Sequence, residues 1–249
     1  MVASSPARAQ GMYSGNLRSL AELINPLVKG APLSKSQVRI EMPLLADNGN
    51  LVSIGITSNL PMTEQEHVEK IYLLSQRNPV VQMATFYLGP WSGEVNINTR
   101  VRLAGSQFIV ALAQTSKGRF YYDQFDVIVT ESACVDGSSF MSAARLQVLG
   151  ELRVGRVVRV RLLIQHAMDT GYLQNMSGQN IARNIIKKIT CQADQFEIFR
   201  VDPSSGIAAN PYFEFSWLAF PAKTIKTLWV DDLGIEGELI TPIEILPKS

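Results

Sequence analysis

Chemically reactive side chains are scarce in this sequence. It holds two cysteines, Cys134 and Cys191, and two histidines, His67 and His166, among 249 residues. The cysteines lie far apart, and CxxC and HExxH patterns are absent, so no zinc-site spacing is present. Glycine-rich phosphate loops and the Gly-x-Ser-x-Gly motif are also missing. The sequence therefore offers no catalytic, cofactor-binding or metal-ligating set, and we predict that the chain is not an enzyme.

Charge is modest and unclustered. Charged residues make up 18% of the chain and the formal net charge is +1, with lysine and arginine scattered along it. Nucleic-acid and anionic-membrane surfaces require clustered positive charge, so we expect neither partner. No apolar run approaches the roughly 18 residues needed to cross a bilayer. With 46% hydrophobic residues there is ample material for buried cores, and we expect a soluble protein.

The N-terminal residues are small and weakly polar. Residues 2–10 contain Ala7-Arg8-Ala9, which fits the A-x-A pattern at the end of a secretory signal. The segment predicts export, and the alternative is an unstructured tail.

A short helix followed by strands is predicted for the first half. Leucine and isoleucine recur at helical spacing between Leu17 and Leu27, with Ser14 as the expected cap and Pro26 and Gly30 limiting the end. From Gln37 the period becomes two, and turn residues separate the apolar–polar runs. This pattern is typical of an antiparallel β-sandwich. The alternating positions are Val38, Ile40, Val95, Ile97, Val101, Leu103, Phe108, Val110, Leu112, Phe120, Tyr122, Phe125, Val127 and Val129.

The stretch 63–74 has two interpretations. Thr63-Glu64-Gln65-Glu66 fits a capping box that would begin a helix. The alternation of Val68, Lys70 and Tyr72 with Ile71 and Leu73 fits a strand equally well.

The small, polar run 131–139 interrupts the pattern and predicts a loop or linker around Cys134. Strand alternation then resumes at 158–164, where Arg159 and Arg161 form a cationic outer face. The chain is therefore expected to be all-β, with two antiparallel β-sandwiches and a short N-terminal helix. The predicted divisions are 1–134 (core 37–134), a linker at 135–145, and 146–249. Apolar positions for the second core are Ile189, Cys191, Phe196, Ile198, Tyr212, Phe213, Phe215, Trp217, Leu228, Val230, Ile243 and Ile245.

Ordered segments in both halves resemble a known pair of families. The first half is similar to SoxY, the sulfur-binding subunit of the thiosulfate-oxidising system, and the second to its partner SoxZ. Matching segments in the first half are Pro61-Met62-Thr63, His67-Val68-Glu69-Lys70-Ile71-Tyr72, Asn78-Pro79, Ala84-Thr85-Phe86-Tyr87 and Thr99-Arg100-Val101-Arg102-Leu103-Ala104. In the second half they are His166-Ala167-Met168-Asp169-Thr170-Gly171, Cys191, Ala208-Ala209-Asn210-Pro211-Tyr212 and Trp229-Val230-Asp231-Asp232.

The resemblance implies two immunoglobulin-like domains, a strand at 67–75 and a periplasmic carrier of sulfur compounds. SoxY holds its cargo on a cysteine in a Gly-Gly-Cys-Gly-Gly arm, and Cys134 stands where that cysteine belongs. The implied attachment site is Cys134, and the implied partners are periplasmic sulfur-oxidation enzymes. An exposed thiol there would also allow a homodimer through Cys134.

The flanks of Cys134 depart from the family arm. Ser132-Ala133 precede it and Val135-Asp136 follow, so only Gly137 is left as glycine. A β-branched valine is stiffer than glycine, and the arm continues into the second half. These features resemble a fused SoxYZ-like subgroup associated with quinoprotein dehydrogenases. The alternative function is therefore a non-covalent accessory or scaffold protein for such a dehydrogenase.

Five other residues have ordinary structural interpretations. Cys191 lies on an apparent strand, where a free cysteine is usually buried in the core. His166 and Met168 suggest a redox metal, but a blue-copper site needs two histidines and a cysteine. With one histidine in each half, a turn at the interdomain contact is the better hypothesis. Asp231-Asp232 predicts a solvated acidic turn, with a weak cation site as the alternative.

Overall fold

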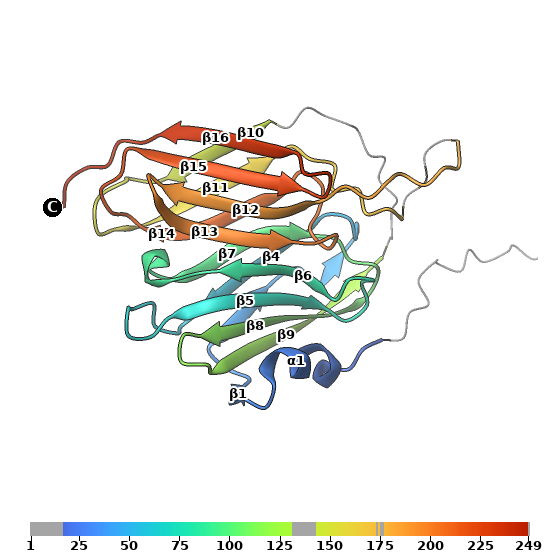
Figure 1. The fold of residues 1–249 in the computed structure, drawn as a ribbon. Coiled ribbons are helices and arrows are strands. Elements are labelled where there is room, and N and C mark those ends of the chain that lie inside the picture. Colours follow the sequence, from blue (N-terminus) through green and yellow to red (C-terminus); the bar gives the residue numbers. More distant parts are fainter. Residues whose placement is uncertain (1–16, 131–142, 173, 175–176, 249) are drawn as a thin grey trace, which may run out of the picture.

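A computed structural model describes residues 17–130, 143–172, 174 and 177–248, and it consists of two facing β-sheets with one short α-helix (Figure 1). The strands of the first half are β1 (Leu33–Ser34), β2 (Val38–Glu41), β3 (Leu45–Ala46), β4 (Val52–Ser58), β5 (Val68–Ser75), β6 (Gln82–Tyr87), β7 (Val95–Val101), β8 (Gln107–Thr115) and β9 (Phe120–Val129). Those of the second are β10 (Ala144–Leu149), β11 (Val157–Ile164), β12 (Ile186–Ala193), β13 (Phe196–Pro203), β14 (Tyr212–Leu218), β15 (Thr224–Asp231) and β16 (Glu236–Pro242). A 3-10 turn, η1, covers Pro90–Ser92. The all-β class and the antiparallel β-sandwich architecture are confirmed.

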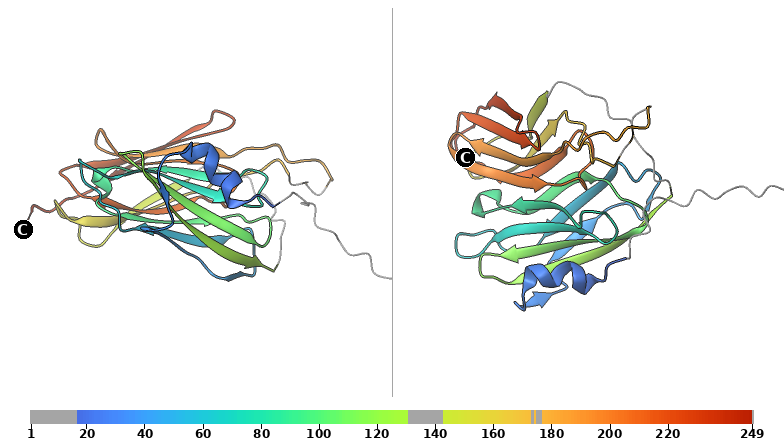
Figure 2. Two further views of the ribbon diagram at one scale, coloured as in Figure 1. Left: turned by 90° about the horizontal axis from the view of Figure 1, so that it is seen from below. Right: turned by 45° about the vertical axis from the view of Figure 1, so that its right-hand side comes forward.

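The two halves share both sheets. One sheet runs β1-β9-β8-β5-β6-β13-β12-β15-β16 with β3 also beside β9, and the other runs β10-β11-β14-β7-β4-β2. At the seam between the halves, β6 pairs with β13 and β7 with β14, both antiparallel. The expected pair of sandwiches is thus joined edge to edge into one continuous two-layer structure (Figures 1 and 2). Only the short β1 and β3 depart from antiparallel pairing among the named strands of the described residues, since each lies parallel to β9.

Aromatic side chains fill the space between the sheets at the seam. Phe86 from the first half lies 6.2 Å from Phe213 and 6.4 Å from Phe199 of the second, centroid to centroid. Phe199 stacks on Phe215 at 4.0 Å. All four rings are almost fully buried, which follows from the inward positions of the period-two pattern. The seam is therefore an apolar core as well as a pair of strand ladders.

The helix α1 (Leu20–Val28) packs on the outer face of the larger sheet, against Leu74, Val110 and Leu112. Its cap is Ser19, which forms a capping box with Glu22, so the expectation of Ser14 as the cap was wrong. Ser14 itself lies outside the described residues. Pro26 lies inside the helix and does not end it, because the helix closes at the left-handed Lys29, whose N–H donates to the carbonyl of Asn25.

The contested stretch is a turn followed by a strand. The Thr63 hydroxyl accepts from the Glu66 N–H at 3.2 Å, as in a capping box, but no helix follows. Instead β5 begins at Val68 and pairs with both β6 and β8. Tertiary pairing on both edges outweighs the local helix signal here. Among the described residues, no helix is both long and apolar enough to cross a membrane.

Candidate functional site

The last strand of the first half is held closely where it ends. The Ile128 N–H donates to the Leu44 carbonyl at 2.8 Å, and the Thr130 N–H donates to the Ala46 carbonyl at 3.1 Å. The Thr130 hydroxyl also donates to the Asp47 carbonyl at 3.4 Å. Thr130 is the last described residue before Cys134, so the first half fixes the chain where it leaves β9.

The second half fixes the chain where it returns. The carbonyl of Ala143 accepts a hydrogen bond from the Gln165 N–H at 2.7 Å. The next residue, His166, is held in turn by Asn210, whose N–H donates to the His166 carbonyl at 2.8 Å and whose side-chain oxygen accepts from the His166 N–H at 3.2 Å. The loop after β11 thus anchors the start of β10.

Arg102 of the first half reaches across the seam to this loop. Its guanidinium donates to the carbonyl of Met168 at 2.5 Å and to that of Ala167 at 3.1 Å. Its own carbonyl accepts from the Asn78 side chain at 2.7 Å, which holds the strand end in place. Burial lowers the pKa of Arg102 while nearby Asp169 opposes the change, and a guanidinium so far above neutral pH stays charged. Arg102 is therefore a charged interdomain clamp on the segment 166–169.

The same loop contains a histidine whose side chain is almost enclosed. The Met168 N–H donates to His166 Nδ1 at 3.0 Å, and a backbone N–H can only donate, so Nδ1 accepts. The neutral ring must then carry its proton on Nε2, which lies 3.6 Å from Asp231 Oδ2. The side chains of His166 and Asp231 are only 8% and 5% exposed. Met168 takes the left-handed backbone conformation, with φ 53°, to allow this tight turn. The histidine thus shapes an interdomain turn, as the sequence suggested.

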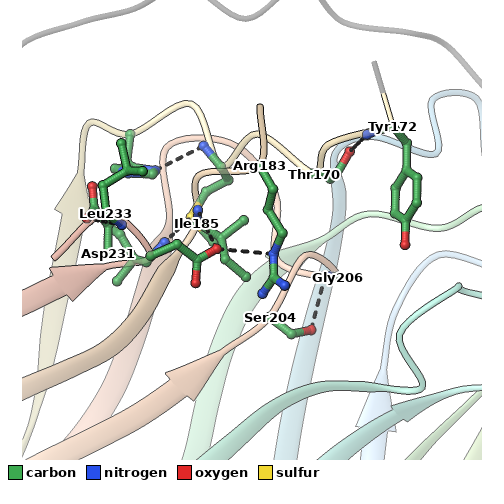
Figure 3. Close-up of polar contacts among 12 residues, drawn as sticks. Thr170, Tyr172, Arg183, Ile185, Ser204, Gly206, Asp231 and Leu233 are labelled. Carbon is green, nitrogen blue, oxygen red and sulfur yellow. Dashed lines mark hydrogen bonds and ion pairs between the residues drawn. The ribbon is translucent and has the colours of Figure 1, made fainter. Parts of the chain in front are cut away.

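The two adjacent aspartates have different surroundings. Asp231 is buried, and its Oδ1 accepts from the N–H groups of Leu233 at 2.9 Å and Ile235 at 2.8 Å. The expectation of a solvated turn was therefore wrong for Asp231, because its carboxylate closes the turn after β15. Asp232 is exposed and pairs with Arg183 at 3.1 Å. Figure 3 shows Arg183 together with Asp231 and Leu233 of this turn. Among the described residues, no group of three or more histidine, cysteine or acidic side chains could hold a metal ion.

The structure describes one of the two cysteines. Cys191 is fully buried on β12, and its sulfur lies 3.5 Å from Thr227 Oγ1. Burial raises the pKa of Cys191 to about 12, so its thiolate is not available near neutral pH. The predicted core role of Cys191 is confirmed. Cys134 lies outside the described residues, so its role as an attachment site stays a prediction.

Comparison with known families agrees with this two-part organisation. The family described as sulfur oxidation protein SoxY matches residues 25–134, and sulphur oxidation protein SoxZ matches residues 148–239. The chain is a fused SoxYZ-like protein. Its first half therefore corresponds to SoxY and its second to SoxZ, and the SoxY match ends at Cys134. The domain limits 1–134 and 146–249, with the linker at 135–145, stay predictions.

Several solved structures are similar to part of the chain. The sulfur carrier protein SoxY from Chlorobium limicola f thiosulfatophilum is 22% identical, covering 44% of this chain and 90% of that one, with a TM-score of 0.38. A putative superoxide reductase from Thermotoga maritima is 22% identical over 42% and 90%, with a TM-score of 0.33. The superoxide reductase (neelaredoxin) from Ignicoccus hospitalis is 12% identical over 45% and 99%, with a TM-score of 0.35. No curated protein sequence matches the chain.

The interdomain role of Arg102 was not predicted from the sequence. Arg102 lay in a segment that resembles SoxY, but nothing in the period-two pattern distinguishes it from Arg100, two positions earlier on the same face. The difference arises at the seam, where Arg102 meets two backbone carbonyls of the SoxZ-like half and Arg100 does not.

Proposed function

We propose that this chain is a periplasmic carrier that holds a sulfur compound covalently on Cys134 and presents it to enzymes of sulfur oxidation. The observation that carries the proposal is the SoxY family match, which ends at Cys134. The only other cysteine of the sequence, Cys191, is buried with a pKa of about 12 and cannot react at a useful rate. Both matched families are sulfur oxidation proteins, which supports a carrier or accessory role over catalysis.

The anchors on either side of Cys134 connect its segment to both halves of the molecule. Cys134 can lie at most about 14 Å from Thr130, because an extended residue spans about 3.5 Å. Thr130 is bonded to the β3 segment of the SoxY-like half, and Ala143 to Gln165 of the SoxZ-like half. Arg102 of the SoxY-like half also contacts the loop that follows Gln165, at the carbonyls of Ala167 and Met168. A partner enzyme would therefore meet the cargo close to both halves.

Loading needs an electron acceptor. Joining the Cys134 thiolate to the terminal sulfur of thiosulfate forms one S–S bond and releases two electrons. Those electrons must pass to a partner redox protein, since the carrier chemistry itself supplies no oxidant. A thiosulfate-oxidising enzyme of the periplasm or a quinoprotein dehydrogenase system would accept these two electrons.

A non-covalent scaffold for a quinoprotein dehydrogenase is the second candidate. Val135 and Asp136 replace the glycines that would let the arm enter a narrow active site, and this observation favours it. In that case Cys134 would carry no cargo.

Intact-mass analysis separates the two functions. Protein would be purified from host cells during growth on thiosulfate, without reductant, and compared with a Cys134→Ser variant. We expect a sulfur-containing mass increase that disappears with external thiol and is absent from the variant. An unmodified wild-type protein, or an adduct that persists in Cys134→Ser, would contradict the carrier proposal and leave the scaffold function in its place.

A further inference from the structure

A polar groove crosses the seam on the outer face of the smaller sheet. It has a volume of about 490 Å³, and its lining comes from β2, β4 and β7 of the SoxY-like half and from β14 of the SoxZ-like half. The groove is therefore complete only when the two halves are joined. Its lining does not include Thr130, Ala143 or the residues that bind them.

Outward-facing positions on β4 and β7 form its centre. Ser53 faces Arg100 and Gly55 faces Asn98 in the register of the two strands. A side chain at Gly55 would bring its Cβ to 2.9 Å from the Asn98 side-chain oxygen, so the missing side chain opens this part of the groove. Ser53, Asn98 and Arg100 together direct a hydroxyl, an amide and a guanidinium toward one region.

The carboxylates of the groove are already neutralised by arginines. Glu41 pairs with Arg39 at 3.3 Å. Glu214 pairs with Arg159 at 2.8 Å and with Arg161 at 3.1 Å. Burial alone would raise the pKa of Glu214, but hydrogen bonds from Tyr212 and Arg161 and the charge of Arg159 lower it overall, so Glu214 is ionised and occupied near neutral pH.

Arg100 supplies a positive charge that the carboxylates of the groove do not neutralise. Its guanidinium lies over the ring of Tyr212 at 4.8 Å, and within the described part of the chain no carboxylate stands within ion-pair distance of it. Stacking on an aromatic ring fixes the plane of a guanidinium and leaves its N–H edge available for hydrogen bonds. Arg161 lies on the same ring at 6.0 Å and adds a second positive charge nearby.

We propose that this groove binds a small tetrahedral oxyanion of the sulfate or thiosulfate class, held by Arg100 with help from Ser53 and Asn98. A planar, oriented guanidinium matches two oxygens of such an anion, and the neighbouring hydroxyl and amide can donate to a third. Four arginines stand against two carboxylates in and around the groove, which favours a divalent anion over a neutral ligand. The site does not use Cys134, so it would stand even without covalent cargo.

Calorimetric titration with sodium thiosulfate at constant ionic strength tests this proposal. We expect saturable binding by the wild-type chain, at least 10-fold weaker binding by Arg100→Gln, and an intermediate loss in Arg100→Lys, which keeps the charge without the planar fork. Arg145→Gln is the matched control, because Arg145 is an exposed arginine on β10 of the same sheet and does not line the groove. Thermal unfolding of each variant checks that the fold is intact.

The outcomes separate this site from the carrier function. Binding that survives in Cys134→Ser supports a groove site, whereas binding lost in that variant would overturn it. Equal weakening by Arg145→Gln would show diffuse attraction to the sheet and would also overturn it, as would linear heats without saturation. A parallel titration with phosphate identifies the source of the anion: similar affinity supports a general oxyanion site, and weaker affinity supports a sulfur oxyanion.

Discussion

The seam between the halves is built differently in its interior and at its end. In the interior, β6–β13 and β7–β14 pair and the rings of Phe86, Phe199 and Phe213 are buried. At the end, Arg102 holds the 166–169 loop through hydrogen bonds to two carbonyls. Apolar burial contributes several kcal/mol per aromatic residue, whereas a hydrogen bond contributes about 1 kcal/mol net. The interior therefore supplies most of the stability, and the polar end fixes the 166–169 loop of the SoxZ-like half against the SoxY-like half.

Removing one ring from the interior should have the largest effect. We expect Phe213→Ala to lower the free energy of unfolding by about 3–5 kcal/mol, because it leaves a cavity between the sheets. Urea denaturation followed by tryptophan fluorescence would measure it. Phe196→Ala is the control: this ring is 59% exposed and should cost far less. If the variant instead unfolded in two separate transitions at unchanged midpoint, the two halves would be independent and the shared core would have little importance.

The sequence predicted the fold class and many of the strands but not the seam. Period-two alternation located the strands because each strand buries one face, and it placed Cys191 in the core. It could not give the pairing of β6 with β13, because alternation defines which face is buried and not which strand lies beside it. The same limit explains β5, where alternation alone left helix and strand equal. The resemblance to SoxY implied a strand at 67–75, and the pairing of β5 on both edges confirms it.

Polar details of the site depended on contacts between distant residues. Asp231 appeared to be a solvated carboxylate because two acidic residues stand together, but the turn after it provides two N–H groups that hold it in a buried position. Arg102 and Arg100 have the same local pattern, and only the opposite half distinguishes them. The helix cap was also predicted wrongly: Ser14 was the expected cap, whereas the helix that packs on the sheet begins at Leu20 with Ser19 as its cap.

Breaking the polar end should have an intermediate effect. Arg102→Leu removes both hydrogen bonds and leaves the carbonyls of Ala167 and Met168 without that partner, so we expect a loss of about 1–3 kcal/mol. Hydrogen exchange should show faster exchange at the amides of the 166–169 loop. Arg39→Leu changes an arginine whose side chain is 75% exposed and should stay within about 0.5 kcal/mol. Unchanged exchange in this loop would mean that Arg102 does not clamp it.

A smaller effect should appear at acidic pH on the outer face beside the seam. Because the folded-state pKa of Glu214 is lowered, its contribution to stability is complete above the unfolded-state pKa of about 4.3 and is lost as pH falls through the lower, folded value. We therefore expect Glu214→Gln to be slightly less stable than the wild type at pH 7 and equal to it in strong acid. Thermal unfolding between pH 7 and pH 2.5 would show this. A constant difference across that range would mean that the ion pairs of Glu214 with Arg159 and Arg161 add nothing.

The smallest effect on folding should come from the residue with the largest expected effect on function. The small, polar neighbours of Cys134 predict an exposed thiol, so Cys134→Ser should change the free energy of unfolding by less than about 0.5 kcal/mol. Cys191→Ser should lower the free energy of unfolding more, by about 1–3 kcal/mol. It places a hydroxyl in a fully buried position, where Thr227 Oγ1 is the polar atom that contacts the present sulfur.

Maleimide labelling under native conditions gives the complementary measurement. The wild type should label rapidly at one thiol, and Cys134→Ser should not, because a thiol with a pKa of about 12 has almost no thiolate at pH 7. A Cys134→Ser variant that melts several degrees lower would instead make Cys134 a structural residue, and the scaffold function would then explain the chain better than a covalent carrier.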